Sequence, residues 1–163
     1  MIKTNIDRRA FIGAAGAAAT GVLLFAREGA AAPTPFRVNR TPAEWKRLLG
    51  AQRFEILRNA GTELPFTSPL LKEHRKGMFL CAGCAQPLFS SQTKFESGTG
   101  WPSFWKPIAG SVVTRTDRSL LIERTEVLCA RCGGHLGHVF NDGPKPTGLR
   151  YCMNGLALTF RPA

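Results

Sequence analysis

Cys81-Ala82-Gly83-Cys84 is one of two C-x-x-C pairs in this chain of 163 residues, and the second is Cys129-Ala130-Arg131-Cys132. Each pair is typical of a knuckle, a tight turn that presents two thiolates to one ion, and Gly83 and Gly133 suit such turns. Two knuckles supply four thiolates, the closed tetrahedral set that zinc prefers in structural sites. Because protein thiolates fill all four ligand positions, we predict a structural zinc ion with no open position for chemistry.

The separation of the two pairs indicates how this metal site is built. The 44 residues between Cys84 and Cys129 exceed the usual spacing of about 15–20 residues between paired cysteines of a zinc site. We therefore expect the metal to join two hairpins that are distant in sequence. Two disulfides, or two redox-active C-x-x-C motifs, are the alternative interpretation of the same four cysteines.

Short apolar runs on both sides of the cysteines predict β-strands. The 17 Gly and 11 Pro residues are spread without a period and indicate many turns. We predict a mainly β fold: a small antiparallel β domain of two sheets, stapled by zinc, with short helices at its N-terminal edge. The expected strands are Met78–Leu80, Pro87–Phe89, Ser111–Arg115, Leu120–Thr125, Leu136–Phe140 and Tyr151–Phe160, of which the third and fourth form a hairpin around Asp117-Arg118-Ser119.

The helices are expected directly before this β region. Thr41-Pro42-Ala43-Glu44 has the pattern of a capping box, with Pro42 at the first helical position, and Gly50 is predicted to end the first helix. A second short helix is expected to end near Asn59-Ala60-Gly61. The apolar residues of both helices are predicted to pack in the core, namely Trp45, Leu48, Leu49, Phe54, Ile56 and Leu57.

The N-terminal segment is predicted to be a removable export signal. Arg8 and Arg9 precede a weakly apolar run rich in Ala and Gly, a pattern similar to a twin-arginine signal. Such a signal exports folded proteins, so the metal could be loaded in the reducing cytoplasm before transfer to the periplasm. Cleavage is expected after residue 31, because Pro33 is unfavourable directly after a cut at residue 32. An uncleaved membrane anchor is the alternative.

This interpretation divides the chain into a signal at 1–31, a linker at 32–40 and a folded domain at 41–163. The formal net charge of the chain is +11, and removal of residues 1–31 leaves about +9. Such a charge can attract nucleic acid or anionic lipid. The charges are scattered, however, and neither an RNP-like aromatic motif nor a long basic stripe accompanies them. We therefore expect a solvated basic surface and no nucleic-acid partner.

The fifth cysteine, Cys152, has no close partner in sequence. An isolated cysteine is ordinarily buried and inert. Here Arg150 precedes it by two residues and could favour the thiolate electrostatically. His135 and His138 share a Gly-rich stretch suited to acid–base chemistry, and Trp101 lies on a turn where it could form the apolar wall of a pocket.

These features belong to motifs that resemble one family. The motifs are the two C-x-x-C pairs, G-T-G-W-P-S-F at 98–104, G-H-L-G-H-V-F-N-D-G-P at 134–144 and R-Y-C-M-N at 150–154. Together they resemble a peptide-methionine (R)-S-oxide reductase of the B type, and the resemblance covers about residues 41–161. It implies a zinc-bearing β fold, an oxidoreductase that repairs oxidised methionine, and a catalytic domain at 41–163.

The resemblance also implies a role for each matching residue. Cys152 matches the nucleophile, which attacks the sulfoxide sulfur and becomes a sulfenic acid. His135 and His138 match the histidines that bind or protonate the sulfoxide oxygen, and Asn154 matches an active-site asparagine. Trp101 matches the indole that packs on the substrate methyl group. Arg150 and Phe140 complete the substrate-binding set, and the metal ligands are Cys81, Cys84, Cys129 and Cys132.

One position departs from the family pattern. Many members carry a resolving cysteine where this chain has Thr99. We therefore expect an external thiol, either thioredoxin-like or a small molecule, to reduce the sulfenic acid at Cys152. The remaining expectations are a substrate that is oxidised methionine in proteins or as the free amino acid, membrane contact only during export, and a monomeric protein.

Two other functions fit part of the sequence. A zinc-ribbon binding module with a basic surface explains the four paired cysteines and the charge, but it leaves Trp101, both histidines and Cys152 without a role. A thiol peroxidase or redox sensor built on Cys152 is the second alternative. Preference for peroxide over methionine sulfoxide would distinguish it.

Overall fold

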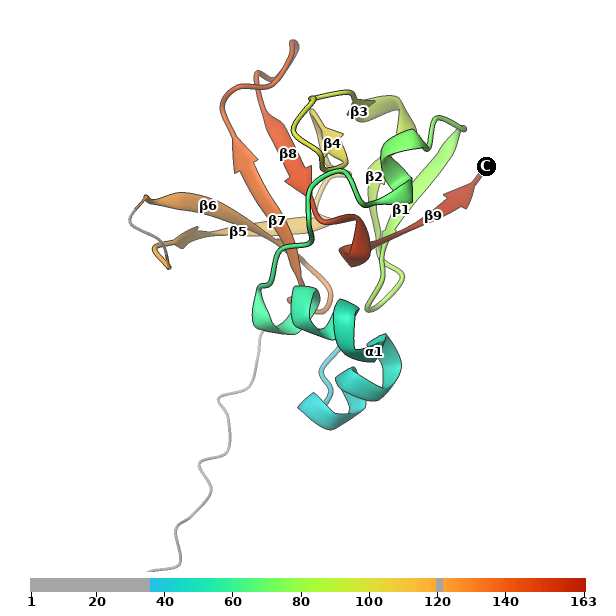
Figure 1. The fold of residues 1–163 in the computed structure, drawn as a ribbon, viewed down its shortest axis with the longest axis vertical. Coiled ribbons are helices and arrows are strands. Elements are labelled where there is room, and N and C mark those ends of the chain that lie inside the picture. The colour runs from blue at the N-terminus through green and yellow to red at the C-terminus, as the bar shows by residue number, and fades with distance from the viewer. Residues whose placement is uncertain (1–35, 120–121) are drawn as a thin grey trace, which may run out of the picture. The chain divides into compact units, whose positions relative to one another are not determined.

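The computed structural model describes residues 36–119 and 122–163 (Figure 1). The predicted export signal and the first residues of the predicted linker lie outside these ranges. Within the described residues, no helix has the length and hydropathy that a membrane span requires.

Helix α1 (Pro42–Asn59) begins with the expected capping box. Thr41 Oγ1 accepts a hydrogen bond from the Glu44 amide at 3.3 Å, and the Glu44 carboxylate accepts one from the Thr41 amide at 2.8 Å. At Gly50 the backbone leaves the helical region, with φ 71° and ψ 172°, so α1 consists of two helical segments, as predicted. The prediction for Leu48 was wrong: its side chain is 56% exposed.

The strands form two antiparallel sheets, as predicted (Figure 1). The first has the order β2-β1-β9, with β1 (Gly77–Cys81), β2 (Pro87–Ser90) and β9 (Leu158–Pro162). The second has the order β3-β4-β8-β7-β6-β5. Its strands are β3 (Lys94–Phe95), β4 (Ser103–Phe104), β5 (Val112–Asp117), β6 (Arg124–Cys129), β7 (His135–Phe140) and β8 (Arg150–Met153). Short 3₁₀ helices lie between these elements: η1 (Pro69–Lys72) between α1 and β1, η2 (Ser91–Thr93) between β2 and β3, and η3 (Gly155–Ala157) between β8 and β9.

Two predicted strands differ from the structure. The hairpin around Asp117 is present. Leu120 and Leu121, the first residues of its predicted second strand, lie outside the described residues, and the described strand begins at Arg124, after Ile122 and Glu123. The single strand predicted at Tyr151–Phe160 was wrong, because η3 interrupts it. Its first part, β8, pairs with β4 and β7, and its second part, β9, pairs with β1 in the other sheet. The chain therefore crosses between sheets directly after Cys152.

The core lies where the two sheets meet. Phe79 on β1 and Phe89 on β2 come from the three-stranded sheet, and both contact Phe104 on β4 of the six-stranded sheet. The ring centroids are 4.9 Å apart for Phe79 and Phe104, in an edge-to-face arrangement, and 4.3 Å apart for the stacked Phe89 and Phe104. All three rings are fully buried. These contacts fix β4, and with it the neighbouring β8, against the first sheet.

Candidate active site and metal site

The four paired cysteines form one cluster. Their sulfur atoms all lie within 4.8 Å of one another, with 3.7 Å between Cys81 and Cys132 and 3.5 Å between Cys84 and Cys129. A disulfide would bring two sulfurs to about 2.05 Å. Four thiolates at about 2.3 Å from a central zinc ion would be about 3.8 Å apart, close to the observed distances. The geometry therefore fits one tetrahedral metal ion, and it does not support the alternative of two disulfides.

The backbone of the two knuckles is closely matched. The Ala85 amide donates to the Cys81 carbonyl oxygen at 2.8 Å, and the Gly133 amide donates to the Cys129 carbonyl oxygen at 2.8 Å. Both donors adopt left-handed conformations, with φ 56° at Ala85 and 67° at Gly133. The expectation for Gly133 is confirmed. Gly83 does not occupy the equivalent position, which belongs to Ala85.

The cluster joins the two sheets. Cys81 is the last residue of β1 in the three-stranded sheet, and Cys129 is the last residue of β6 in the six-stranded sheet. The prediction that the four cysteines join two hairpins distant in sequence is therefore confirmed. Helix α1 packs over the cluster: Arg58 Nη1 donates to the Cys132 carbonyl oxygen at 3.0 Å, and its guanidinium lies 4.9 Å from the centre of the Trp45 ring.

A separate cavity of about 120 Å³ contains most of the other predicted site residues. Five of the seven side chains that the family motifs single out line it, since only His135 and Arg150 lie outside the lining. The lining consists of Thr62, Trp101, Arg124, Gly137, His138, Phe140, Cys152 and Asn154. One thiol, one imidazole, one amide and two aromatic rings thus converge on a space the size of a small side chain.

Strand register explains why these residues meet. His138 on β7 lies directly opposite Cys152 on β8, and Ser103 on β4 lies opposite Cys152 from the other side. Cys152 therefore stands in the middle of the six-stranded sheet, between two neighbouring strands. Residues separated by 14 and 49 positions in sequence become direct cross-strand neighbours in this way.

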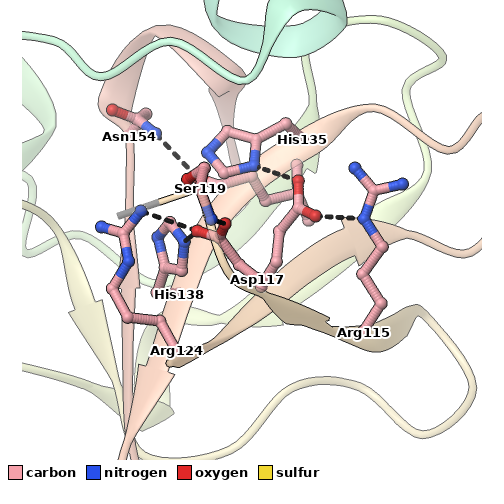
Figure 2. Close-up of polar contacts among 9 residues, drawn as sticks. Arg115, Asp117, Ser119, Arg124, His135, His138 and Asn154 are labelled. Atoms are coloured by element: carbon pink, nitrogen blue, oxygen red, sulfur yellow. Dashed lines mark hydrogen bonds and ion pairs between the residues drawn. The ribbon is translucent and has the colours of Figure 1, made fainter. Parts of the chain in front are cut away.

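Each histidine of the site has a carboxylate partner (Figure 2). His138 Nε2 lies 2.8 Å from Asp117 Oδ2, and His135 Nδ1 lies 2.6 Å from Glu126 Oε1. An arginine supports each carboxylate: Arg124 Nη2 donates to Asp117 Oδ2 at 2.6 Å, and Arg115 Nε donates to Glu126. Figure 2 shows the two rings side by side, and their centroids are 5.4 Å apart.

The surroundings set the charge of these groups. Hydrogen bonds from Ser119, with further support from His138 and Arg124, hold the pKa of Asp117 well below its usual range. Asp117 is therefore an anion at neutral pH. Burial lowers the pKa of His135 and so favours its neutral ring, although the Glu126 carboxylate acts in the opposite direction.

Cys152 is a half-buried thiol, and burial raises its pKa. The Thr99 hydroxyl and then the Arg150 charge act in the opposite direction. Arg150 thus favours the thiolate, as expected, although burial has the larger effect. The Arg150 guanidinium itself is held by both carboxylate oxygens of Asp142, at 2.8 and 2.9 Å, and lies 4.4 Å from the centre of the Phe140 ring.

Glu63 connects two walls of the cavity, and the sequence did not indicate it. Its carbonyl oxygen accepts from Trp101 Nε1 at 3.2 Å, and its amide donates to Asn154 Oδ1 at 3.0 Å. Its buried carboxylate accepts from the amides of Gly155 and Leu156 at 2.5 and 2.9 Å, at the start of η3. Asp117, Glu126 and Arg124 were also missed, because their roles depend on strand register. A carboxylate within an otherwise apolar strand, as in T-E-V-L-C, is the one signal that could have indicated Glu126.

Comparison with known proteins places this arrangement in a family. Residues 49–162 match the family model described as the SelR domain. The chain belongs to the SelR family. The match covers both cysteine pairs and every residue that lines the cavity, so the cysteine cluster and the cavity are both parts of the SelR domain.

Several relatives of this SelR-family chain are named peptide methionine sulfoxide reductase MsrB. One from Leptospira interrogans is 54% identical over 127 residues, which is 77% of this chain and 97% of the relative. Another, from Agrobacterium fabrum, is 50% identical over 127 residues, or 77% of this chain and 94% of the relative. A third, from Methanosarcina barkeri, is 51% identical over 125 residues, or 76% of this chain and 88% of the relative.

Proposed function

We propose that this protein is an oxidoreductase that reduces methionine (R)-sulfoxide, in polypeptides or as the free amino acid, to methionine. The observation that carries this proposal is the cavity of about 120 Å³ in which Cys152 lies beside Trp101 and His138. Membership of the SelR family and relatives named peptide methionine sulfoxide reductase at 50–54% identity support the same reaction.

Cys152 is the nucleophile in this mechanism. Its thiolate attacks the sulfoxide sulfur and forms an S–S bond while the oxygen takes up a proton. The resulting hydroxyl group then moves to the cysteine sulfur as this S–S bond breaks. The sulfoxide S–O bond breaks and a Cys152 S–O bond forms, which gives methionine and a cysteine sulfenic acid. The substrate sulfur gains two electrons and the Cys152 sulfur loses two. The reaction therefore needs no redox cofactor in this half of the cycle.

His138 is the residue best placed to handle the proton, because it lines the cavity opposite Cys152. The anionic Asp117 at 2.8 Å fixes the ring and can stabilise positive charge that builds on it during proton transfer. His135 stands behind it, with its ring held by Glu126. In this proposal His135 supports the proton-handling ring.

The arrangement of apolar and polar groups around the cavity supplies the selectivity for one sulfoxide epimer. A sulfoxide carries one polar oxygen and one apolar methyl group, and a chiral pocket must separate them. Trp101 and Phe140 offer the apolar surface for the methyl group, while His138 and Asn154 offer polar atoms for the oxygen side. Arg150 lies against the Phe140 ring and holds it in place while adding positive charge near Cys152.

The metal in the cysteine cluster is proposed to be zinc with a structural role. Two sulfur pairs lie 3.5 and 3.7 Å apart and all four sulfurs lie within 4.8 Å of one another, which suits tetrahedral coordination by four thiolates and leaves no open position for substrate. When bound, zinc would link β1 to β6 and so hold the two sheets together. It takes no part in the chemistry at Cys152.

The sulfenic acid is proposed to be reduced by an external thiol. The chain has five cysteines, and four of them form the cluster proposed to hold zinc. A thioredoxin-like protein or a small thiol would form a mixed disulfide with Cys152, and a second external thiol would release the reduced enzyme.

We propose that a twin-arginine signal at residues 1–31 directs export of the protein, which then acts in the periplasm. The proposal is supported by the paired Arg8 and Arg9 before an Ala- and Gly-rich run. The localisation of a fluorescent fusion, compared in cells with and without a twin-arginine translocase, tests this proposal. Continued export in cells that lack the translocase would contradict it.

The central experiment supplies the purified protein with the separate R and S sulfoxide epimers of a blocked methionine and with dithiothreitol. We expect methionine from the R epimer alone, and no product from Cys152→Ser with its metal retained. Turnover of neither epimer by the folded, zinc-loaded protein would contradict the proposed function. Faster consumption of peroxide than of the R epimer would instead favour a thiol peroxidase.

A further inference from the structure

A chain of three hydroxyl groups ends on the Cys152 thiol. Thr99 Oγ1 lies 3.8 Å from Cys152 Sγ, within hydrogen-bonding reach of a sulfur atom, and 2.8 Å from Ser97 Oγ. Ser97 Oγ lies 2.8 Å from Ser103 Oγ, and Ser103 Oγ lies 3.1 Å from the Trp101 carbonyl oxygen. The chain therefore connects the nucleophile to the backbone of the loop that carries the indole wall.

The far end of this chain fixes its direction when the thiol is neutral. Each hydroxyl carries one hydrogen, and a carbonyl oxygen can only accept. Ser103 therefore donates to the Trp101 carbonyl, Ser97 donates to Ser103, and Thr99 donates to Ser97. Thr99 is left with a lone pair facing the sulfur, and the S–H group of Cys152 satisfies it.

Ionisation of Cys152 makes this direction unfavourable. A thiolate has no hydrogen to donate, so its negative charge would face the Thr99 lone pair. Rotation about the three C–O bonds reverses the chain without moving a heavy atom: Ser103 donates to Ser97, Ser97 to Thr99, and Thr99 to the thiolate. Only the hydrogen bond to the Trp101 carbonyl is lost, whereas a charge-assisted bond is gained.

We propose that Thr99 is a catalytic residue whose hydroxyl accepts from the Cys152 thiol and turns to donate to the Cys152 thiolate. The inference rests on the proposed function in so far as Cys152 is the nucleophile. The row of hydroxyl groups ends on the Trp101 carbonyl oxygen, which can only accept a hydrogen bond. It therefore cannot carry the thiol proton away. Its function is to stabilise the charge of the nucleophile.

The surroundings of the sulfur make such a responsive donor useful. Ser103 is 1% exposed, so water does not replace the inner part of the chain. The ionisable groups near the thiol are Arg150 on its own strand, His138 opposite on β7 and Arg124 on the cavity wall. Arg150 and Arg124 are permanently charged and also engaged by Asp142 and Asp117. The hydroxyl of Thr99 can instead change direction with the state of the sulfur.

The test is the pH dependence of alkylation at Cys152 in the reduced full-length protein, measured with iodoacetamide and peptide mass spectrometry. Only the thiolate reacts, so the rate follows its population. Thr99→Val removes the hydroxyl with little change of shape, and we expect it to lower the rate at pH 7 by about tenfold. The midpoint of the profile should move to higher pH while the plateau at high pH stays unchanged. Thr99→Ser, which keeps the hydroxyl, and Thr114→Val, on exposed β5, should match the unsubstituted protein.

Three outcomes would overturn the inference. A Thr99→Val profile that overlays the unsubstituted one would show that no hydroxyl stabilises the thiolate. Equal shifts in Thr99→Val and Thr99→Ser would assign the effect to something other than the hydroxyl. A lowered plateau with an unchanged midpoint would indicate altered access to the sulfur. Because alkylation needs no sulfoxide, failure of the proposed reductase activity would leave this result interpretable on its own.

Discussion

Three hydrogen-bond donors approach the Asp117 carboxylate. His138 Nε2, Arg124 Nη2 and the Ser119 amide all approach its carboxylate within 2.9 Å. These contacts stabilise the anion and hold its pKa well below the ordinary value of 3.8. A neutral amide at this position would offer one acceptor oxygen and would turn an NH₂ group toward the remaining donors. The carboxylate is therefore expected to matter for stability as well as for the orientation of His138.

We predict that Asp117→Asn destabilises the protein at pH 7 and that the difference shrinks in acid. A folded-state pKa below the unfolded one contributes stability that is complete above the unfolded pKa and is lost as pH falls through the folded value. The gap between variant and unsubstituted protein should thus be full at pH 7 and smaller at pH 3. Urea denaturation at both pH values measures it. Glu123→Gln, at an exposed residue, serves as the control, and an equal gap for Asp117→Asn at both pH values would contradict the prediction.

Residue-level sequence reasoning identified five of the eight residues that line the cavity, but not the residues that hold them. Trp101, His138, Cys152 and Asn154 belong to local motifs that can be recognised without a structure. The carboxylates behind them come from other strands, and their roles follow from cross-strand register, which a single sequence does not define. Glu63 illustrates this limit, since it contacts Asn154, 91 positions away.

The β7–β8 pair is the element that aligns the candidate nucleophile with its histidine. Gly137 lies opposite Met153, and a Cβ at Gly137 would stand 2.1 Å from the Cys152 carbonyl oxygen and 3.0 Å from the Met153 Cα. Backbone atoms cannot yield to such a contact as a flexible side chain would. Only a residue without a Cβ allows the two strands to approach this closely between the two histidines.

We predict that Gly137→Ala separates β7 from β8 and displaces Cys152. The overpacking should cost about 1–3 kcal/mol of unfolding free energy, and a displacement near 1 Å should lower kcat by about 100-fold. Gly148→Ala is the control: Gly148 has φ 69° and open space around it, so only about 1 kcal/mol of backbone strain is expected, with activity retained. Denaturation and steady-state kinetics test both, and a fully active Gly137→Ala would refute the prediction.

The strand after Cys152 shows why an element-level prediction failed. Residues 151–160 alternate in hydrophobicity, a pattern that indicates one strand. Gly155 nevertheless begins η3, where the Glu63 carboxylate accepts its amide and a Cβ would stand 1.9 Å from Ser68 Oγ. Tertiary contacts from residues 63 and 68 thus divide the segment between two sheets. Local pattern cannot reveal a division that distant residues impose.

At the scale of the whole molecule, the two-sheet fold could be predicted from the sequence, because the two cysteine pairs indicate a contact between segments that are distant in the chain. The predicted knuckles lie at the ends of β1 and β6, one in each sheet. A metal ion there would constrain the two sheets together with the Phe79, Phe89 and Phe104 contacts. The two-residue strands β3 and β4 were not predicted, because strands this short leave only a weak local pattern in the sequence.

We predict that Cys132→Ser loses the metal and destabilises the entire domain. Three remaining thiolates bind zinc more weakly, and binding free energy contributes directly to folding. The melting temperature should fall by at least about 10 °C, with activity lost at 37 °C. Metal content and calorimetry measure the two effects. Cys152→Ser, also a single cysteine substitution, should keep full metal content and its melting temperature, and equal metal loss in both variants would contradict the assignment.

The cysteine inventory of the whole chain leads to the last prediction. Four of the five cysteines form the proposed zinc site, and Thr99 rather than a cysteine lies 3.8 Å from Cys152 Sγ. With no thiol reductant, one turnover should therefore leave Cys152 as a sulfenic acid, since no neighbouring thiolate is free to condense with it. We expect about one methionine per protein, a dimedone adduct on Cys152 by mass spectrometry, and bound zinc unchanged.

Thr99→Cys is the matched comparison: it should give an internal disulfide with Cys152 and no adduct. An internal disulfide in the unsubstituted protein, or release of zinc during the turnover, would show that a cluster cysteine resolves the sulfenic acid and that the external thiol acts later than proposed.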